Sequence, residues 1–221
     1  MNRCCIRILA LVPVVVMLGC NVVSATVAIP DPVVDAPLAA AKGEQTAVLA
    51  GGCFWGIEAV FEHVKGVIDV DSGYAGGSAG SAHYEIVSGG RTGHAESVRI
   101  KYDPSKISYG QLLKVFFSVA HDPTQLNRQG PDHGTQYRSA IFCSNEDQKR
   151  IAQAYIDQLN QAKVFGAPIV TAVSVGVTFY VAEAYHQDYV VHHPDEAYIV
   201  INDLPKVANL RKQFPNLYRS R

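Results

Sequence analysis

The chain has 221 residues, of which 48% are hydrophobic and 18% are charged, and its formal net charge at pH 7 is −1. This near balance of charge, without a basic stripe interleaved with aromatic residues, argues against a nucleic-acid partner. The length fits one main domain of about 150–180 residues with additional segments.

Residues 1–25 have the features of a signal peptide. Arg3 and Arg7 precede an apolar run at residues 8–18, which is short for a membrane span. Small residues at Val23-Ser24-Ala25 suit a signal peptidase, whereas Met17-Leu18-Gly19-Cys20 looks like a bacterial lipoprotein box that would place lipid on Cys20. Both alternatives stay open. Either one predicts a periplasmic, exported protein, and the second predicts membrane anchoring through Cys20.

Cysteine usage does not indicate a disulfide scaffold. The five cysteines are Cys4, Cys5, Cys20, Cys53 and Cys143. Export would remove the first two and remove or acylate the third. The mature domain would then hold two cysteines, too few for a disulfide framework even in a compartment that permits one.

The proline-rich and alanine-rich segment 26–45 is expected to be a flexible linker, and the folded domain is expected to span residues 46–217. Periodicity and capping signals predict its elements in chain order. They are a strand at 46–50, a helix at 53–65, a strand at 67–70, a glycine-rich loop at 72–81, a strand at 96–102, a helix after the capping box at 108–111, a polar loop at 121–136, a strand at 137–142, a helix at 145–162, a strand at 169–177, a helix at 182–192 and a short helix at 206–214.

The resulting order β-α-β-β-α-β resembles a split βαβ arrangement. It predicts an α+β class (a mixed α/β sandwich) with a ferredoxin-like core, in which helices pack on a mixed sheet.

Cys53 stands where the first strand turns into the first helix, after Gly51 and Gly52. A thiol in the first turn of a helix lies near free N–H groups and the positive end of the helix dipole, so we expect its pKa to be lowered. This placement favours a nucleophile over the alternative of a small buried hydrophobic side chain.

Three further side chains could complete a polar site. Glu96 shares the apolar face of its strand with Val98, so its pKa is expected to rise and it could act as a general acid. The alternative is an exposed glutamate paired with Arg91 or Arg99. In the following loop, Asp132 and Tyr137 could donate or accept hydrogen bonds at a substrate oxygen, whereas Tyr74 and Tyr84 are by default surface aromatics.

Other chemistries fit the pattern less well. The sequence has no Cys-x-x-Cys, no His-Glu-x-x-His and no clustered ligand spacing, so no metal site is expected. Two alternatives to redox catalysis stay open. One is a hydrolase or acyltransferase in which His94 or His186 activates Cys53. The other is a thiol sensor or binding module without turnover.

Four motifs together resemble the class A methionine sulfoxide reductases, the peptide-methionine (S)-S-oxide reductases. The resemblance covers roughly residues 46–217. The motifs are Gly52-Cys53-Phe54-Trp55-Gly56, Gly73-Tyr74-Ala75-Gly76-Gly77, Thr92-Gly93-His94-Ala95-Glu96 and His133-Gly134-Thr135-Gln136-Tyr137-Arg138-Ser139.

The resemblance implies a catalytic set. Cys53 would attack the sulfoxide sulfur and become a sulfenic acid, and Glu96 would protonate the sulfoxide oxygen. A second set would hold the substrate: Tyr84, Asp132 and Tyr137 at the oxygen, Phe54 and Trp55 at the methyl group. The implied substrate is free or protein-bound methionine (S)-sulfoxide, so the activity is the repair of oxidised proteins. No bound cofactor is implied, and thioredoxin, a glutaredoxin-like protein or another thiol would be the reductant of what we expect to be a monomer.

The chain departs from the fuller family pattern at the second cysteine, which many members use to resolve the sulfenic acid. Ile199 and Ser88 occupy the expected places, and no cysteine follows Cys143. Cys143 is expected at the far end of its strand, about 20 Å away at ~3.3 Å per residue, beyond the reach of a disulfide. We therefore expect a one-cysteine enzyme that an external thiol reduces directly.

Overall fold

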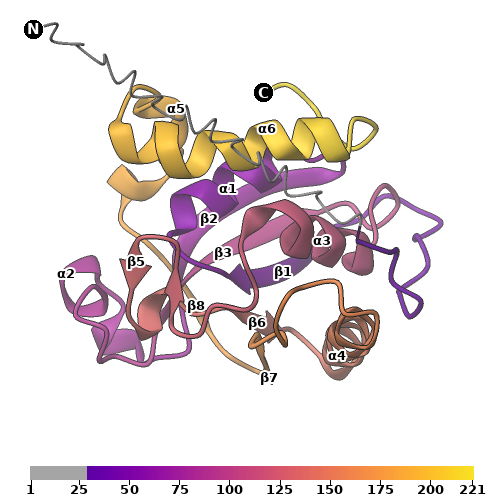
Figure 1. Cartoon of the computed structure of the whole chain (residues 1–221), viewed down its shortest axis with the longest axis horizontal. Coiled ribbons are helices and arrows are strands. Elements are labelled where there is room, and N and C mark those ends of the chain that lie inside the picture. Colours follow the sequence, from indigo (N-terminus) through magenta and orange to yellow (C-terminus); the bar gives the residue numbers. More distant parts are fainter. Residues whose placement is uncertain (1–28) are drawn as a thin grey trace, which may run out of the picture.

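A computed structural model describes residues 29–221, and its centre is a six-stranded mixed sheet (Figure 1). The strand order is β7-β6-β1-β3-β2-β8. These strands are Ala172–Val175, Ala140–Cys143, Gln45–Ala50, Ala95–Tyr102, Val67–Ala75 and Phe179–Val181. All neighbours are antiparallel except β6 and β7, which are parallel.

The inner strands confirm the predicted split βαβ core. β1 and β2 both pair with β3 in antiparallel register, with Leu49 opposite Val98 and Tyr74 opposite Glu96. The connection from β1 to β2 runs through helix α1 (Phe54–Glu62), and β3 lies between β1 and β2 in the sheet. This arrangement brings the carboxyl end of β1, where Cys53 follows, next to the amino end of β3, where Glu96 lies.

One face of the sheet carries the main core. α1 packs there with α3 (Tyr109–Val115), which continues as a π-helical turn at Phe116–Ala120, and α4 (Glu146–Gln161) packs by β6, β7 and α3. The predicted capping box is present, since the Ser108 side chain accepts from the Gln111 N–H and the Gln111 side chain accepts from the Ser108 N–H. Leu49, Val98 and Ile100 are fully buried on this face, as the alternation predicted.

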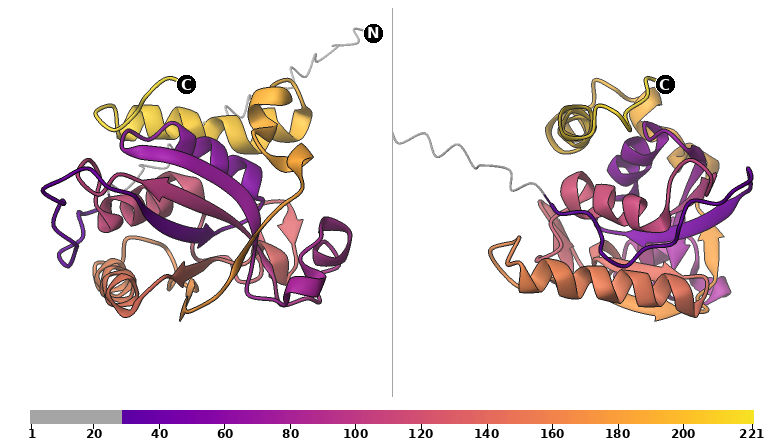
Figure 2. Two further views of the ribbon diagram at one scale, coloured as in Figure 1. Left: turned by 180° about the vertical axis from the view of Figure 1, so that it is seen from behind. Right: turned by 90° about the vertical axis from the view of Figure 1, so that its right-hand side faces the viewer.

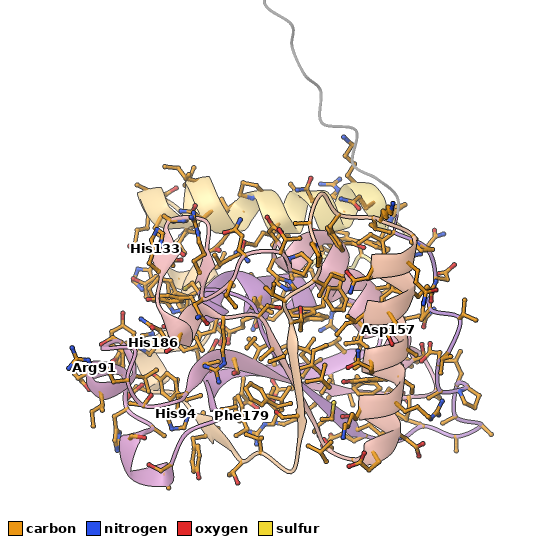
Figure 3. All side chains as sticks on the ribbon, turned by 60° about the horizontal axis from the view of Figure 1, so that its bottom comes forward. Arg91, His94, His133, Asp157, Phe179 and His186 are labelled. Carbon is orange, nitrogen blue, oxygen red and sulfur yellow. The ribbon has the colours of Figure 1, made fainter. Side chains whose placement is uncertain are left out.

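The opposite face of the sheet is partly polar. Arg99 pairs with Asp71 at 2.8 Å, and its guanidinium lies 5.1 Å from the ring centre of Phe179, which is labelled in Figure 3. Because Arg99 is engaged there, it is not the partner of Glu96.

Short elements complete the site-bearing side of the domain. They are the 3₁₀ turns η1 (Ala79–Ser81), η3 (Thr135–Tyr137) and η4 (Ala184–His186), the short helices α2 (Tyr84–Val87) and α5 (Tyr189–His192), and the hairpin of β4 (Arg128–Gln129) and β5 (Asp132–His133). The last helical elements are a π-helical turn at Ile199–Asp203 and α6 (Leu204–Gln213), which lies along α1 on the side away from the sheet (Figures 1 and 2).

The predicted helix at 182–192 is wrong. The segment instead forms η4 and the single turn α5, and Asp188 between them has a left-handed φ of 55°. The reason is a tertiary contact: the Gln187 amide bonds both the N–H and the carbonyl of Ser72, at 2.9 and 3.1 Å, and so extends the edge pairing of β2.

The predicted loop at 72–81 is also corrected, because β2 runs through to Ala75. Gly73 is needed there for close approach rather than for a turn. A Cβ at this position would lie 2.2 Å from the Tyr180 carbonyl oxygen on β8.

Part of the expected linker is packed on the domain. Tyr155 donates to the Pro30 carbonyl at 2.7 Å, and Asp35 accepts from the Gly110 N–H at 2.7 Å in the first turn of α3. The signal peptide, its cleavage site and the lipid acceptor Cys20 lie outside the described residues. Across residues 29–221, no helix has the length and apolar character needed to span a membrane.

Candidate active site

The predicted site residues meet in one pocket at the amino end of α1. The pocket has a volume of about 170 Å³. It is lined by Cys53, Phe54, Trp55, Tyr84, Glu96, Asp132, Tyr137 and Tyr198. All of these except Tyr198 were predicted from the sequence, from segments that lie as far apart as residues 53 and 137.

Cys53 lies at the amino end of a helix, as predicted, and is the N-cap residue of α1, but its environment differs from the expected one. Burial raises the pKa of the Cys53 thiol, and the negative charges of Glu96 and Asp203 add to this effect. The Trp55 N–H and the charge of Lys206 act in the opposite direction. The expectation of an acidic thiol is therefore wrong, because burial, together with the acidic side chains Glu96 and Asp203, outweighs the helix terminus.

Glu96 is a buried acid next to Cys53, which is one of the two alternatives that the strand alternation left open. Its side chain is 2% exposed, and its Oε2 accepts from the Phe54 N–H at 3.2 Å. The pKa of Glu96 is raised to about 8, mainly by burial and also by the negative charge of Asp132, while the Phe54 N–H opposes the rise. The carboxyl is thus mainly protonated near neutral pH, which is the form that a general acid needs. The alternative of an exposed, arginine-paired glutamate is excluded.

Three tyrosines face the thiol and the carboxyl. Burial raises the pKa values of Tyr84 and Tyr137, so both keep their phenolic proton and can donate a hydrogen bond. Tyr198 was missed from the sequence. Its hydroxyl donates to Asp132 Oδ2, and no motif around it distinguishes it from a core tyrosine. Tyr74, expected at the surface, is instead fully buried, and its hydroxyl donates to Glu183 at 2.8 Å.

Phe54 and Trp55 form the apolar wall of the pocket, and His186 contacts both side chains. The Trp55 indole N–H donates to Nδ1 of His186 at 3.3 Å, and the indole stacks on the Tyr189 ring at 3.7 Å. The His186 ring centre lies 5.0 Å from that of Phe54. Burial lowers the pKa of His186, so the ring is neutral and Nδ1 is free to accept this bond.

Neither histidine that was considered as a base lines the pocket. Both are labelled in Figure 3. His94 is 1% exposed, and its ring nitrogens bond the Gly77 N–H and the Ser78 carbonyl, at 3.2 and 2.9 Å. Nδ1 of His186 is occupied by Trp55, and its Nε2 lies 3.9 Å from Glu183 rather than at the thiol. The geometry therefore does not support a Cys–His hydrolase or acyltransferase.

Cys143 is separated from Cys53 by the register of the sheet. Phe142 pairs with Val48, so Cys143 lies beside the middle of β1, whereas Cys53 follows the end of that strand. Its sulfur lies 3.9 Å from the Tyr109 hydroxyl, within the core. Both cysteines in residues 29–221 are free thiols. Ile199 is fully buried against α1, and Ser88 is exposed at the end of α2.

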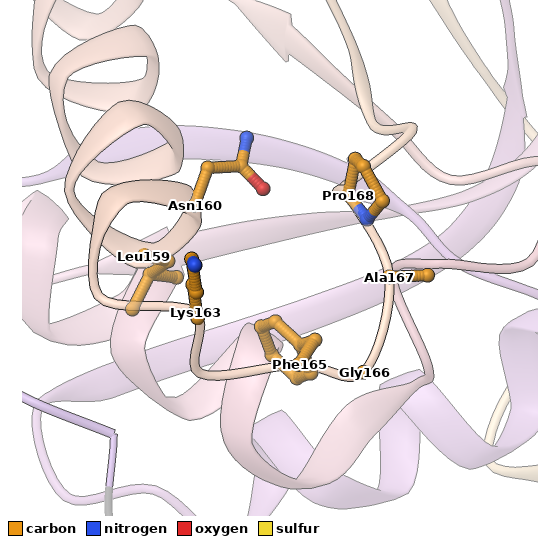
Figure 4. A pocket seen from close by; sticks show the side chains of 7 residues that line it. All are labelled: Leu159, Asn160, Lys163, Phe165, Gly166, Ala167 and Pro168. Carbon is orange, nitrogen blue, oxygen red and sulfur yellow. The ribbon is translucent and has the colours of Figure 1, made fainter.

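A second cavity, of about 470 Å³, lies at the other side of the domain (Figure 4). The end of α4 and the following turn form it, with Leu159, Phe165 and Pro168 as its apolar wall and Lys163 at its side. No cysteine, histidine or carboxylic acid side chain lines it. Within the part of the chain that the structure describes, no cluster of three or more histidine, cysteine or acidic side chains could hold a metal ion.

Comparisons with known proteins point to one family. A family model described as "Peptide methionine sulfoxide reductase" matches residues 45–218. "Peptide methionine sulfoxide reductase MsrA 2" of Mesorhizobium japonicum is 65% identical over 179 residues, which cover 81% of this chain and 92% of that protein. The protein of the same name from Synechocystis is 56% identical over 188 residues, covering 84% and 88%. The solved structure of reduced Mxr1 from Saccharomyces cerevisiae has a TM-score of 0.62 and 34% identity, covering 73% of this chain and 91% of that one.

Proposed function

The chain belongs to the peptide methionine sulfoxide reductase family, and from this premise we propose how the pocket at the amino end of α1 carries out the reaction. As a member of this family, it is an oxidoreductase that reduces free or protein-bound methionine (S)-sulfoxide to methionine and thereby repairs oxidised proteins. It needs no bound cofactor and takes its electrons from a thiol.

Cys53 is the proposed nucleophile. Its sulfur attacks the sulfoxide sulfur, and the balanced result is that sulfoxide and thiol become thioether and sulfenic acid. The substrate sulfur is reduced by two electrons and the Cys53 sulfur is oxidised by two. The observation that carries this assignment is the convergence of Cys53 and Glu96 on one small pocket with three phenolic donors.

Glu96 is the proposed acid for this step. In the resting pocket the thiol and the carboxyl both hold a proton near neutral pH, because burial raises both pKa values. Glu96 gives its proton to the sulfoxide oxygen as the Cys53 sulfur attacks, and it then accepts the thiol proton. No proton is gained or lost overall, so a closed pocket can complete the step without exchange with solvent.

Tyr84, Tyr137 and Asp132 are the proposed binding groups for the sulfoxide oxygen. That oxygen gains negative charge when its bond to sulfur polarises, and neutral phenols aimed at it lower the energy of this state. Asp132 contributes through the hydrogen bond that it accepts from Tyr198, which fixes both side chains in the lining of the pocket.

Phe54 and Trp55 are the proposed slot for the methyl group. A pocket of about 170 Å³ admits the end of a methionine sulfoxide side chain and leaves the backbone outside. This size is consistent with activity on both the free amino acid and a residue in a protein. With the oxygen held on one side and the methyl group on the other, one sulfoxide epimer presents its sulfur to Cys53.

The direct experiment is an assay of methionine production with dithiothreitol as reductant. Wild type should reduce a peptide S-sulfoxide and leave the R epimer unchanged. Cys53→Ser should be inactive, and Cys143→Ser should retain wild-type activity because Cys143 is a core side chain. Turnover by Cys53→Ser would refute the assignment.

We also propose that an external thiol reduces the Cys53 sulfenic acid directly. The first thiol forms a mixed disulfide with Cys53 and releases water, and a second thiol restores the Cys53 thiol and leaves with the first as a disulfide. A thioredoxin-like or glutaredoxin-like protein is the proposed physiological reductant, acting on a monomer. Mass spectrometry after one turnover without reductant should find no Cys53–Cys143 disulfide, and finding one would overturn this proposal.

Export to the periplasm remains a proposal supported by residues 1–25, with cleavage after Ala25 or lipidation of Cys20 as the two routes. The mass of the mature amino terminus distinguishes them. A mature protein that starts at Met1 would contradict both.

A further inference from the structure

A buried ion pair lies against the first turn of the catalytic helix. Lys206 Nζ is 3.0 Å from Asp203 Oδ1, and the Asp203 side chain is fully buried while that of Lys206 is 18% exposed. Asp203 ends the π-helical turn, and Lys206 stands in the first turn of α6, which lies along α1. This pair follows Tyr198 in the chain, in the segment where sequence reasoning identified no functional residue.

Gly56 makes room for this pair. A Cβ at position 56 would lie 2.1 Å from Asp203 Oδ1 and 2.6 Å from Lys206 Nζ, so no larger residue fits without displacing both charges. Gly56 follows Cys53 by three positions, and residues with this spacing lie on the same face of a helix, one turn apart. The ammonium and the carboxylate therefore lie about one helical turn along α1 from Cys53.

Several ionisable groups surround Cys53. Glu96 comes from β3, Asp132 from β5, and Tyr84, Tyr137 and Tyr198 complete the pocket. Asp203 approaches from the π-helical turn before α6, and Lys206 approaches from α6 itself. Glu96 and the tyrosines are protonated near neutral pH, since burial raises their pKa values. Among the groups whose charge acts on Cys53, Lys206 is the cation that favours its ionised form.

We propose that Lys206, held by Asp203 against Gly56, is a positioning residue that stabilises negative charge on the Cys53 sulfur during attack and on the sulfenate that follows. This inference rests on the proposed role of Cys53 as the nucleophile and adds a cation that partly offsets the burial and the acidic neighbours that oppose negative charge on the sulfur. Asp203 has the opposite and larger direct effect on the sulfur, because its own charge opposes ionisation of Cys53. Its second oxygen, Oδ2, has no hydrogen-bond partner among residues 29–221.

The opposite signs of the two charges give a test that a purely structural ion pair would not satisfy. The pH dependence of Cys53 alkylation by iodoacetamide is measured on the full chain, by mass spectrometry of the peptide that carries Cys53. We expect Lys206→Met to raise the midpoint and to slow alkylation near pH 8 about tenfold, the effect of one pKa unit. Asp203→Asn should move the midpoint in the opposite direction, and Lys206→Arg should restore the wild-type profile.

Lys149→Met is the matched control. Lys149 forms the same i, i+3 pair with Glu146, at 3.5 Å in the first turn of α4, but that pair is exposed and remote from the pocket. It should leave the midpoint unchanged. Equal midpoints for wild type and Lys206→Met, or a shift in the same direction for Lys206→Met and Asp203→Asn, would overturn the proposal. If Asp203→Asn does not fold, Lys206→Met and its Arg counterpart decide the question.

The readout is independent of turnover. Activity in Cys53→Ser would defeat the proposed function, whereas an unchanged alkylation profile in Lys206→Met would defeat this inference alone. The first-turnover rate of methionine formation should fall with the alkylation rate in Lys206→Met.

Discussion

Replacing Glu96 by glutamine tests whether this side chain supplies the proton to the sulfoxide oxygen. The amide of the introduced glutamine keeps an oxygen that can accept from the Phe54 N–H, so the packing around Cys53 is preserved. The replacement removes the transferable proton. Loss of a positioned general acid reduces the rate of the chemical step by about 10²–10⁴-fold.

The pH profile adds a quantitative expectation. Because the pKa of Glu96 is raised to about 8, the acid form is favoured below this pH and lost above it. About nine molecules in ten carry the proton near pH 7 and about one in ten near pH 9. The wild-type rate of the first turnover should therefore fall about tenfold over this interval. The glutamine variant should show no such decline.

The assay is rapid quenching of methionine formed in the first turnover, without reductant, from acidic to alkaline pH. Glu85→Gln is the matched control, since Glu85 is exposed in the first turn of α2 beside the pocket residue Tyr84. A wild-type rate that rises steadily from pH 7 to pH 9 would refute the reasoning, because it would make the ionised thiol rather than the protonated carboxyl the limiting species.

Three further predictions concern the surroundings of the sulfur and the packed amino-terminal segment. Tyr84→Phe and Tyr137→Phe should each slow the first turnover about tenfold or more by removing a donor to the developing oxyanion, and unchanged rates would exclude that role. His186→Phe should raise KM for the sulfoxide about fivefold, because it removes the hydrogen bond to Trp55, which contributes ~1 kcal/mol. It should also shift the fluorescence of Trp55, the sole tryptophan, and an unchanged spectrum would contradict the proposed contact between His186 and Trp55. Asp35→Ala should lower the free energy of unfolding by about 1–2 kcal/mol in urea, because it removes an acceptor at the amino end of α3, and an unchanged midpoint would show that the packed segment contributes nothing.

Local patterns in the sequence were sufficient for much of the site. The turn before Cys53, the alternation that buries Glu96 and the capping box at Ser108 each depend on a few neighbouring residues, and the structure confirms all three. The role of Tyr84 came from the family resemblance, whereas Asp132 and Tyr137 were also suggested by their polar loop. The fold then brings these segments to one pocket through the pairing of β1, β3 and β2.

What the sequence could not provide depends on contacts between distant segments. The direction of the Cys53 pKa shift was wrong because burial and the charge of Asp203, far along the chain, are invisible to a local argument. Tyr198 enters the pocket only because the C-terminal segment returns along α1. The helix expected at 182–192 is interrupted by the hydrogen bonds of Gln187 to Ser72, which no periodicity reveals.

The account depends on oxygen passing from a substrate sulfur to the Cys53 sulfur. The most direct measurement is a single turnover of a peptide methionine (S)-sulfoxide without reductant, with the products followed together. We predict one methionine formed per protein molecule and one sulfenic acid formed on Cys53, detected as the thioether adduct of a sulfenic-acid reagent on the peptide that contains Cys53. Methionine formed while the Cys53 thiol stays unmodified, or no methionine formed at all, would contradict the account.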